Sequence, residues 1–354
     1  MRRIKNYISK TIVAIIALTL TMQATAQEGE QASFLYKLKG AATKTADFID
    51  YVLNDSDTAY VARNLYNLTV MPQYSLDYEY YSLSSLTDGK QRVEIAPDCR
   101  NKLTLNVGWR WIIVGYSINL NGKKPDFDFN TSLYSARFGL DLFYRKNNAG
   151  YKIRELDGFH KEGAPLQNYN KEFDGISIRQ MGIGLCYAFN KRFSYAAAYG
   201  QSTRQRRSAG SLILGAGYNR QQFTFDHEML ETPIAQQLSN SLKFKEVEYN
   251  DISLNLGYTY NWVFAKNFLA GLSVTPAVSC KFETNRFMES EKRKTDINFD
   301  LTSRAALLYN NGRYYTGASF VSHTFNYKKE QMSMLDSFGI LEVYVGYNFW
   351  RRKR

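Results

Sequence analysis

Apolar and polar residues alternate along most of the chain, and the last alternating stretch shows the pattern most clearly. Leu341, Val343, Val345, Tyr347 and Phe349 occupy every second position, with Glu, Tyr, Gly and Asn between them. Because successive side chains of a strand point to opposite faces, one face of this segment is wholly apolar. This arrangement is typical of a strand that has lipid outside and a polar lumen inside.

Twelve segments of the chain alternate well enough to be predicted as strands. They cover residues 68–82, 102–108, 112–120, 133–145, 176–189, 193–201, 211–225, 252–264, 268–283, 297–309, 314–327 and 341–349. The sequence therefore predicts an all-β fold, an antiparallel transmembrane β-barrel of about 12 strands, with about 10 or 14 as alternatives. Several segments exceed the roughly 9–11 residues that a tilted membrane strand needs, so we expect the barrel to extend above the membrane on one side.

The predicted strands do not give a consistent topology. If both termini are periplasmic, the short turns near Ala265 and Asn310 fall on the periplasmic side, as expected. The long connection at 146–174 then falls on the same side, whereas the tight turn at Asn190 falls outside. An additional strand at 151–156 is an alternative that would change this assignment.

Residues 1–26 are predicted to be a signal peptide. Basic residues near the N-terminus precede a short apolar run, and an A-x-A site ends at Ala26, so we expect cleavage between Ala26 and Gln27. No later stretch approaches the roughly 18 apolar residues of a membrane helix. An exported chain that crosses a membrane without such a helix must form a closed barrel, because closure satisfies every backbone polar group in lipid.

A short amphipathic helix is predicted at 33–53, ahead of the barrel. Phe34, Leu38 and Ala41 begin a set of apolar residues at helical spacing. This apolar face needs a partner, which is either the periplasmic mouth of the barrel or the membrane surface. The expected organisation is a signal peptide at 1–26, a periplasmic segment at 27–60, an outer-membrane barrel at 61–350 and a basic tail at 351–354.

Composition agrees with this organisation. Tyr (27) and Phe (22) are abundant and Pro (6) is scarce. The three cysteines are Cys99, Cys186 and Cys280. Their number is odd, and they are predicted to lie on a loop and on opposite strand faces, which disfavours a disulfide framework or a metal site. The net charge of +12 falls to about +8 without the four basic residues of the signal. A basic face could meet anionic lipopolysaccharide or a nucleic acid, but we favour the alternative of a solvated rim with a basic tail. The expected partners are outer-membrane lipid and lipopolysaccharide, and we expect no nucleic-acid partner and no cofactor.

Charged residues of both signs are predicted to project into the lumen. They are Asp77, Glu79, Arg137, Asp141, Arg179, Lys281, Glu283, Asp296, Asp300, Arg304 and Glu342. One interpretation is a network of ion pairs that fills the interior and fixes strand register. The alternative is a channel in which rings of charge set selectivity. Because a barrel of about twelve strands is narrow, we expect the charges to pair and the barrel to be closed or nearly so, without porin conductance.

Two classes of function remain open. The first is a non-enzymatic binding, transport or structural barrel with a narrow or plugged lumen, and this is the class we favour. The second is a lipid-modifying enzyme of the acyl hydrolase or lipid A deacylase type, whose His-x-Ser pair lies on a strand. His323 is the candidate catalytic residue, but Phe325 occupies the position that Ser would need.

Arg204, Arg206 and Arg207 form the densest basic cluster before the tail. Such clusters bind phosphate or anionic lipid headgroups, and they also occur as solvated turns. The sequence has no Gly-rich phosphate loop, zinc spacing or calcium loop.

Two parts of the chain resemble known sequences. Residues 341–349 resemble the C-terminal signature by which bacterial outer-membrane barrels are recognised, which implies the barrel-assembly machinery as a partner. The run from Phe193 to Ser211, after Phe189-Asn190, resembles a motif of domain-of-unknown-function family 4421, exported barrel-like proteins of Bacteroidota. Ile95-Ala96-Pro97-Asp98 is similar to that family's Tyr-x-Pro-Asn element, with Ala and Asp departing from it. The resemblance covers about residues 50 to 350 and implies a barrel without an established activity.

Overall fold

The computed structural model describes most of the chain after the N-terminal segment. The described residues are 55–86, 90–109, 112–121, 127–148, 150–161, 164–166, 169–283, 295–329 and 331–351. The predicted signal peptide, its cleavage site and the predicted helix at 33–53 lie outside them. Among the described residues, no helix is long and apolar enough to cross a membrane.

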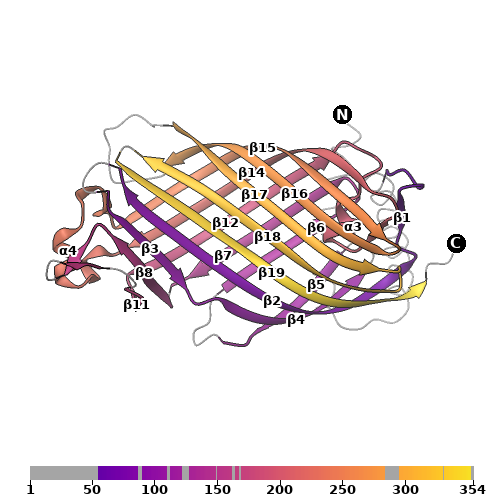
Figure 1. Ribbon diagram of the computed structural model, residues 1–354, viewed down its shortest axis with the longest axis horizontal. Coiled ribbons are helices and arrows are strands. Elements are labelled where there is room, and N and C mark those ends of the chain that lie inside the picture. The colour runs from indigo at the N-terminus through magenta and orange to yellow at the C-terminus, as the bar shows by residue number, and fades with distance from the viewer. Residues whose placement is uncertain are drawn as a thin grey trace, which may run out of the picture. The chain divides into compact units, whose positions relative to one another are not determined.

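Twelve long antiparallel strands make up the wall of the described barrel (Figure 1). Their order around the wall is β5-β4-β2-β19-β18-β17-β16-β15-β14-β12-β7-β6. The first wall strand in the chain, β2, therefore pairs with the last one, β19, and β5 and β6 are the two edges. The bounds are β2 (Tyr66–Ser85), β4 (Arg100–Trp109), β5 (Ile112–Asn119), β6 (Phe127–Tyr134), β7 (Phe138–Asn147), β12 (Ile176–Ala188), β14 (Ala209–Phe225), β15 (Glu246–Ala265), β16 (Phe268–Glu283), β17 (Thr295–Asn310), β18 (Tyr314–Lys329) and β19 (Met332–Arg351).

The two ends of the barrel differ in their connections. At the end that we call the turn end, two-residue and three-residue turns join β15 to β16 and β17 to β18, and β2 begins where β19 stops. At the opposite end, which we call the loop end, long connections precede β12 and follow β14. Figure 1 shows α4, β3, β8 and β11 gathered at the loop end, and α3 with β1 at the turn end.

The predicted total of about twelve strands is confirmed, but two of the individual predictions were wrong. Residues 133–145 are parts of two strands, β6 and β7, separated by a turn at 135–137. Residues 193–201 are not a strand but contain the helix α3 (Tyr195–Tyr199), which Ser194 caps by accepting a hydrogen bond from the Ala197 amide at 3.2 Å. The two errors offset each other in the total. With both corrected, the connection at 146–174 moves to the loop end and the topology becomes consistent.

The outer surface of the wall carries an apolar belt. Leu254, Leu272 and Val343 are all exposed on this surface, as are most outward-facing residues at their level. Toward the loop end, the outward positions of β15 become polar, with Glu246 and Glu248 in place of Ile and Leu. The strands therefore extend beyond the belt on one side, as their length predicted.

A hydrophobic core fills the barrel at the loop end. Tyr81, Phe223 and Phe225 point inward from the wall and are fully buried. Shorter elements supply the rest of this core, for example Tyr151 and Leu242. The elements that contribute are β3 (Arg92–Pro97), β8 (Tyr151–Asp157), α4 (Thr232–Gln237) and η3 (Asn240–Leu242). The same connections also contain β9 (His160–Lys161), β10 (Ala164–Pro165), β11 (Lys171–Glu172) and η2 (His227–Met229). Packed apolar side chains therefore close this end of the lumen.

A second closure lies at the turn end. The connection between β12 and β14 folds inward and forms α3 and β13 (Thr203–Gln205), which pairs with β1 (Val61–Arg63). Ala198 of α3 packs in one buried cluster with Leu269 and Leu308 of the wall. Gly271 faces Ala198 so closely that an added Cβ atom would lie 2.9 Å from the Ala198 Cβ. The helix therefore occupies the mouth of the barrel as a plug.

Candidate functional site

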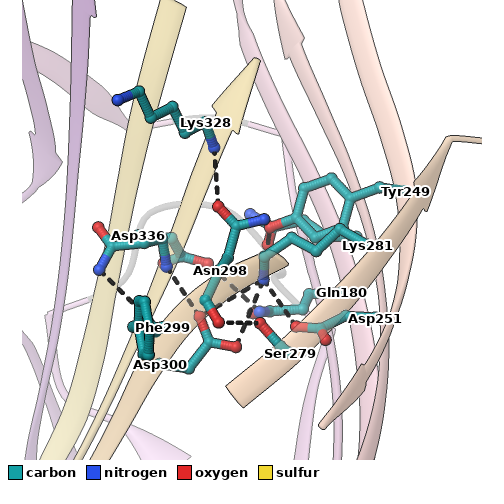
Figure 2. Close-up of polar contacts among 12 residues, drawn as sticks. Gln180, Tyr249, Asp251, Ser279, Lys281, Asn298, Phe299, Asp300, Lys328 and Asp336 are labelled. Carbon is teal, nitrogen blue, oxygen red and sulfur yellow. Dashed lines mark hydrogen bonds and ion pairs between the residues drawn. The ribbon is translucent and has the colours of Figure 1, made fainter. Parts of the chain in front are cut away.

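The space between the two closures is filled by charged and amide side chains. Lys281 of β16 lies at its centre, with only 2% of its surface exposed. Its Nζ atom donates to Asp251 Oδ2 of β15 at 2.7 Å and lies 3.5 Å from Asp300 of β17 (Figure 2). A single ammonium group therefore bridges two buried carboxylates on both neighbouring strands, which satisfies charges that would be costly to bury alone.

Amide and aromatic groups extend this cluster across the lumen. Gln180 of β12 donates to Asp336 Oδ2 of β19 at 3.3 Å (Figure 2). These strands are six positions apart in the wall of twelve, so the contact joins opposite sides of the barrel. Tyr249 donates to Gln221 Oε1 at 2.5 Å and stacks on Tyr327. Side chains from opposite walls therefore meet, and the lumen is narrow at this level.

A second group of charges surrounds Glu79 of β2. Its carboxylate pairs with Arg100 of β4 and with Arg145 of β7, and it accepts a hydrogen bond from the Tyr151 hydroxyl at 3.0 Å. The Arg145 guanidinium also lies over the Phe338 ring, 4.3 Å from its centre. One carboxylate thus connects three wall strands, β2, β4 and β7, with the core of the loop end.

Asp141 and Arg304 form a third group, closer to the plug. Arg304 Nη2 of β17 donates to Asp141 Oδ2 of β7 at 2.7 Å. Asp141 Oδ1 accepts hydrogen bonds from Tyr134 and Ser132 at 2.5 and 2.7 Å. A cavity of about 70 Å³ borders this pair and His323, which is enough space for a few water molecules but not for a continuous pore.

Most of the predicted lumen charges lie inside the barrel. Asp77 pairs with Lys102 at 2.6 Å, and Glu342 accepts hydrogen bonds from Gln73 and Ser319. The inward set is Asp77, Glu79, Asp141, Lys281, Asp300, Arg304 and Glu342. The side chains of Glu283 and Asp296 lie outside the described part of the structure. Six of the seven inward residues make ion pairs, and Glu342 is the exception, because its hydrogen-bond donors are neutral.

Two of the predicted lumen charges were assigned wrongly. Arg179 is exposed on the outer surface of β12, because Gln180 takes the inward position at that level. Arg137 lies in the turn before β7, where it donates to the carbonyls of Ala188 and Phe189. The Arg137 guanidinium is thus satisfied by backbone carbonyls, and the Arg179 side chain is exposed.

Several inward residues were missed by the sequence analysis, among them Asp336, Arg100 and Gln180. Asp336 lies on β19, which begins at Met332 and is longer than the predicted strand at 341–349. Arg100 opens β4 two residues before the predicted start. Gln180 was missed because Arg179 was assigned to the lumen in its place. Asp336 and Arg100 continue the alternation of a predicted strand beyond its predicted end, so that extension was the available signal for these two. Gln180 lies inside the predicted strand at 176–189, and only its face was misassigned.

His323 lies inside the barrel rather than on its lipid-facing surface. Its ring stands among Phe143, Phe325 and Phe338, and Nδ1 lies 3.2 Å from Thr302 Oγ1. A side chain enclosed in this way has no access to an acyl chain in the membrane. The geometry gives no support to the enzymatic alternative.

The three arginines of the basic cluster diverge at the turn end. Arg204 points into a pocket, donating to the Asn311 carbonyl at 3.0 Å. Arg206 and Arg207 are exposed, and their guanidinium groups lie near the Thr58 carbonyl and the Tyr60 ring. The cluster is therefore one pocket residue with two surface residues.

The remaining candidate features have simple positions. Leu341, Val343, Val345, Tyr347 and Phe349 all point outward from β19, as their alternation predicted. Cys99, Cys186 and Cys280 are free thiols. Among the described residues, no group of three or more His, Cys, Asp and Glu side chains is arranged to hold a metal ion.

These features define a membrane β-barrel that is closed at both ends and filled by paired charges. The chain belongs to the family described as Domain of unknown function (DUF4421), whose model matches residues 55–349. This confirms the resemblance noted from the sequence. None of the curated proteins matches the chain.

Similar solved structures are outer-membrane proteins of low sequence identity. The translocator domain of the autotransporter NalP from Neisseria meningitidis is 10% identical, with 92% of this chain and 100% of that chain covered and a TM-score of 0.31. OprG from Pseudomonas aeruginosa is 11% identical, with 82% and 98% covered and a TM-score of 0.25. Ail from Yersinia pestis, in complex with sucrose octasulfate, is 8% identical, with 77% and 98% covered and a TM-score of 0.22.

Proposed function

We propose that the protein is a non-conducting outer-membrane barrel with a binding or structural role. In this proposal the signal peptide is cleaved after Ala26, and the barrel-assembly machinery inserts the chain. The turn end then faces the periplasm and the loop end faces outward, because outer-membrane barrels have short periplasmic turns and longer external loops. The apolar belt contacts membrane lipid, and the part of the wall above it contacts lipopolysaccharide.

One observation carries this proposal: charges pair across the lumen between two closures. The ion pair between Arg304 of β17 and Asp141 of β7 joins opposite sides of the wall, and the hydrogen bond from Gln180 to Asp336 does so at another level. A general pore needs a continuous water path along the axis. Here the loop-end core, the paired charges and α3 occupy that path in succession.

Reconstitution into planar bilayers tests the proposal. Purified protein should first show heat-modifiable gel migration and a strand-rich circular dichroism spectrum, which establish that it is folded. Under conditions in which a general porin gives large steps, we expect no stable conductance from this protein. Stable, ungated, large single-channel steps would overturn the proposal and favour a transport barrel.

A further inference from the structure

A pocket of about 140 Å³ opens at the turn end, beside the plug. Its walls come from four segments that are far apart in the sequence: β1, β13, the turn between β17 and β18, and the end of β19. Arg63, Arg204 and Arg313 line it together with side-chain amides, including those of Asn310 and Asn348. Among its described lining residues there is no Asp or Glu.

The positive charge of this pocket is not neutralised by the described part of the protein. Neither Arg63 nor Arg204 has a carboxylate partner among the described residues. Arg204 donates instead to the Asn311 carbonyl at 3.0 Å and to Asn267 Oδ1 at 3.4 Å. Arg313 donates to the Tyr347 hydroxyl at 2.8 Å. Burial, and in second place the charge of Arg206, lower the pKa of Arg204. An anion in the pocket would relieve this cost.

Asn348, which lines the pocket, carries an unsatisfied acceptor. Asn348 is 1% exposed, and its Nδ2 atom donates to the Gly312 carbonyl at 3.0 Å. Its Oδ1 atom is buried and has no hydrogen-bond partner among the described residues. A buried amide oxygen without a donor is costly, so a ligand that fits this pocket would bring a hydrogen-bond donor as well as negative charge.

We propose that this pocket binds a phosphate group that has a hydrogen-bond donor attached to it or beside it. The arginines supply charge-assisted hydrogen bonds to the phosphate oxygens, and Asn348 Oδ1 accepts the donor. Monohydrogen phosphate meets both requirements, and so does a phospholipid headgroup that carries a hydroxyl or ammonium group. Sulfate supplies the charge without the donor.

The rim around the pocket is compatible with a headgroup as the source. Tyr314 and Trp350 are exposed beside it, and Tyr347 lies beneath Arg313. Tyr and Trp residues mark the headgroup level of a membrane. The pocket thus lies at the end of the barrel at which these aromatic residues gather. This inference does not depend on whether the barrel conducts.

Phosphorus NMR of the full chain in a non-ionic detergent tests the assignment. Inorganic phosphate should show saturable line broadening with the wild-type protein. Arg204→Gln should weaken binding roughly tenfold, which is the effect of losing one charge-assisted hydrogen bond. Arg206→Gln is the matched control, because it removes the same charge two residues away from a side chain that does not line the pocket. Gel migration checks that both variants are folded.

Competition then separates the possible sources. If a short-chain phosphatidylglycerol displaces inorganic phosphate, the lipid headgroup is the ligand. If it does not, free phosphate is the ligand. Both results support a phosphate-binding pocket. Sulfate should compete several-fold less well. Equal competition by sulfate would overturn the role of Asn348. Absence of saturable broadening, or equal losses in Arg204→Gln and Arg206→Gln, would overturn the pocket and indicate only diffuse positive charge.

Discussion

Arg304 and Asp141 form an ion pair across the lumen, with Nη2 and Oδ2 2.7 Å apart, although their strands are five positions apart in the wall. Both side chains are largely buried. The two strands are held by different neighbours, so this contact acts as a strut between the walls. It also means that neither charge can be removed without leaving the other one in a medium of low polarity.

Replacing one member of this strut should be much more damaging than replacing both. Asp141→Asn keeps the shape of the side chain but leaves Arg304 unpaired, which should lower the free energy of unfolding by about 3 kcal/mol. The double variant with Arg304→Gln should recover part of that loss. Denaturant unfolding in detergent, followed by tryptophan fluorescence and gel migration, measures both effects.

The control for this comparison is the outer pair between Arg220 and Glu248. Both residues lie on the outside of the wall, and the Arg220 side chain is 47% exposed. Glu248→Gln should therefore cost less than about 1 kcal/mol, since water screens the pair. Losses of the same size at Asp141 and Glu248 would contradict the view that the lumen pair is buried and unsolvated.

The fit of the plug depends on Gly271. An added Cβ atom there would lie 2.9 Å from the Ala198 Cβ, and the flanking wall cannot move without breaking its pairing with β15 and β17. Gly271→Val should therefore push the segment around α3 out of the mouth. Limited trypsin digestion in detergent should then cut the chain at Arg204 faster than in the wild type.

Gly184 offers a matched control for the plug experiment. It faces the same lumen from β12, but the nearest atom to an added Cβ is 3.9 Å away and a small cavity adjoins it. Gly184→Val should leave the digestion pattern unchanged. If both valine variants accelerate cleavage equally, the exposure results from general loosening of the barrel rather than from displacement of the helix.

The sequence predicted the strands best where lipid lies outside and polar side chains lie inside. There the alternation has a physical cause on both faces, as in residues 252–264 and 341–349. Beyond the belt, both faces of a strand tolerate polar groups, so Arg179 and Gln180 could not be assigned to a face by polarity. The sequence could predict that the lumen charges pair, but not which residue pairs with which. The partners of Asp141 and Asp336 lie on distant strands.

The helix α3 was missed for a different reason. Tyr195, Ala197 and Tyr199 alternate as they would in a strand, and the intervening residues are small. What selects the helix is the Ser194 cap together with burial of Ala198 against Leu269, which is a tertiary contact.

Asp98 gives a prediction for pH dependence. Hydrogen bonds from Lys152 first, and from Arg154, lower the pKa of the Asp98 carboxyl. When the pKa is lower in the folded state, the carboxylate stabilises the fold at every pH above its pKa in the unfolded chain, which is about 4. This stabilisation is lost as the pH falls through the pKa of the folded state. Because the Asp98 side chain is 64% exposed, screening limits the effect to less than about 1 kcal/mol.

The measurement is the difference in unfolding temperature between the wild type and Asp98→Asn. The difference should be small but measurable at neutral pH and should vanish in strong acid, where both side chains are uncharged. Glu248→Gln serves again as the control, because the Arg220–Glu248 pair joins β14 to β15 and does not involve β8 or the start of β4. A difference that persists in acid would show that Asp98 acts through packing rather than through its charge.

The last prediction separates recognition of the terminal strand from its stability. Phe349 ends the outward apolar row of β19, and Phe264 occupies an outward aromatic position at the same end of β15. Alanine at either position should cost a similar amount of burial in the membrane, about 1–2 kcal/mol. Only Phe349→Ala removes part of the C-terminal signature, so it should lower the heat-modifiable fraction in the outer membrane of expressing cells well below that of Phe264→Ala. Equal heat-modifiable fractions for the two variants would mean that the assembly machinery does not recognise the apolar row of β19. The row would then matter only for contact with lipid.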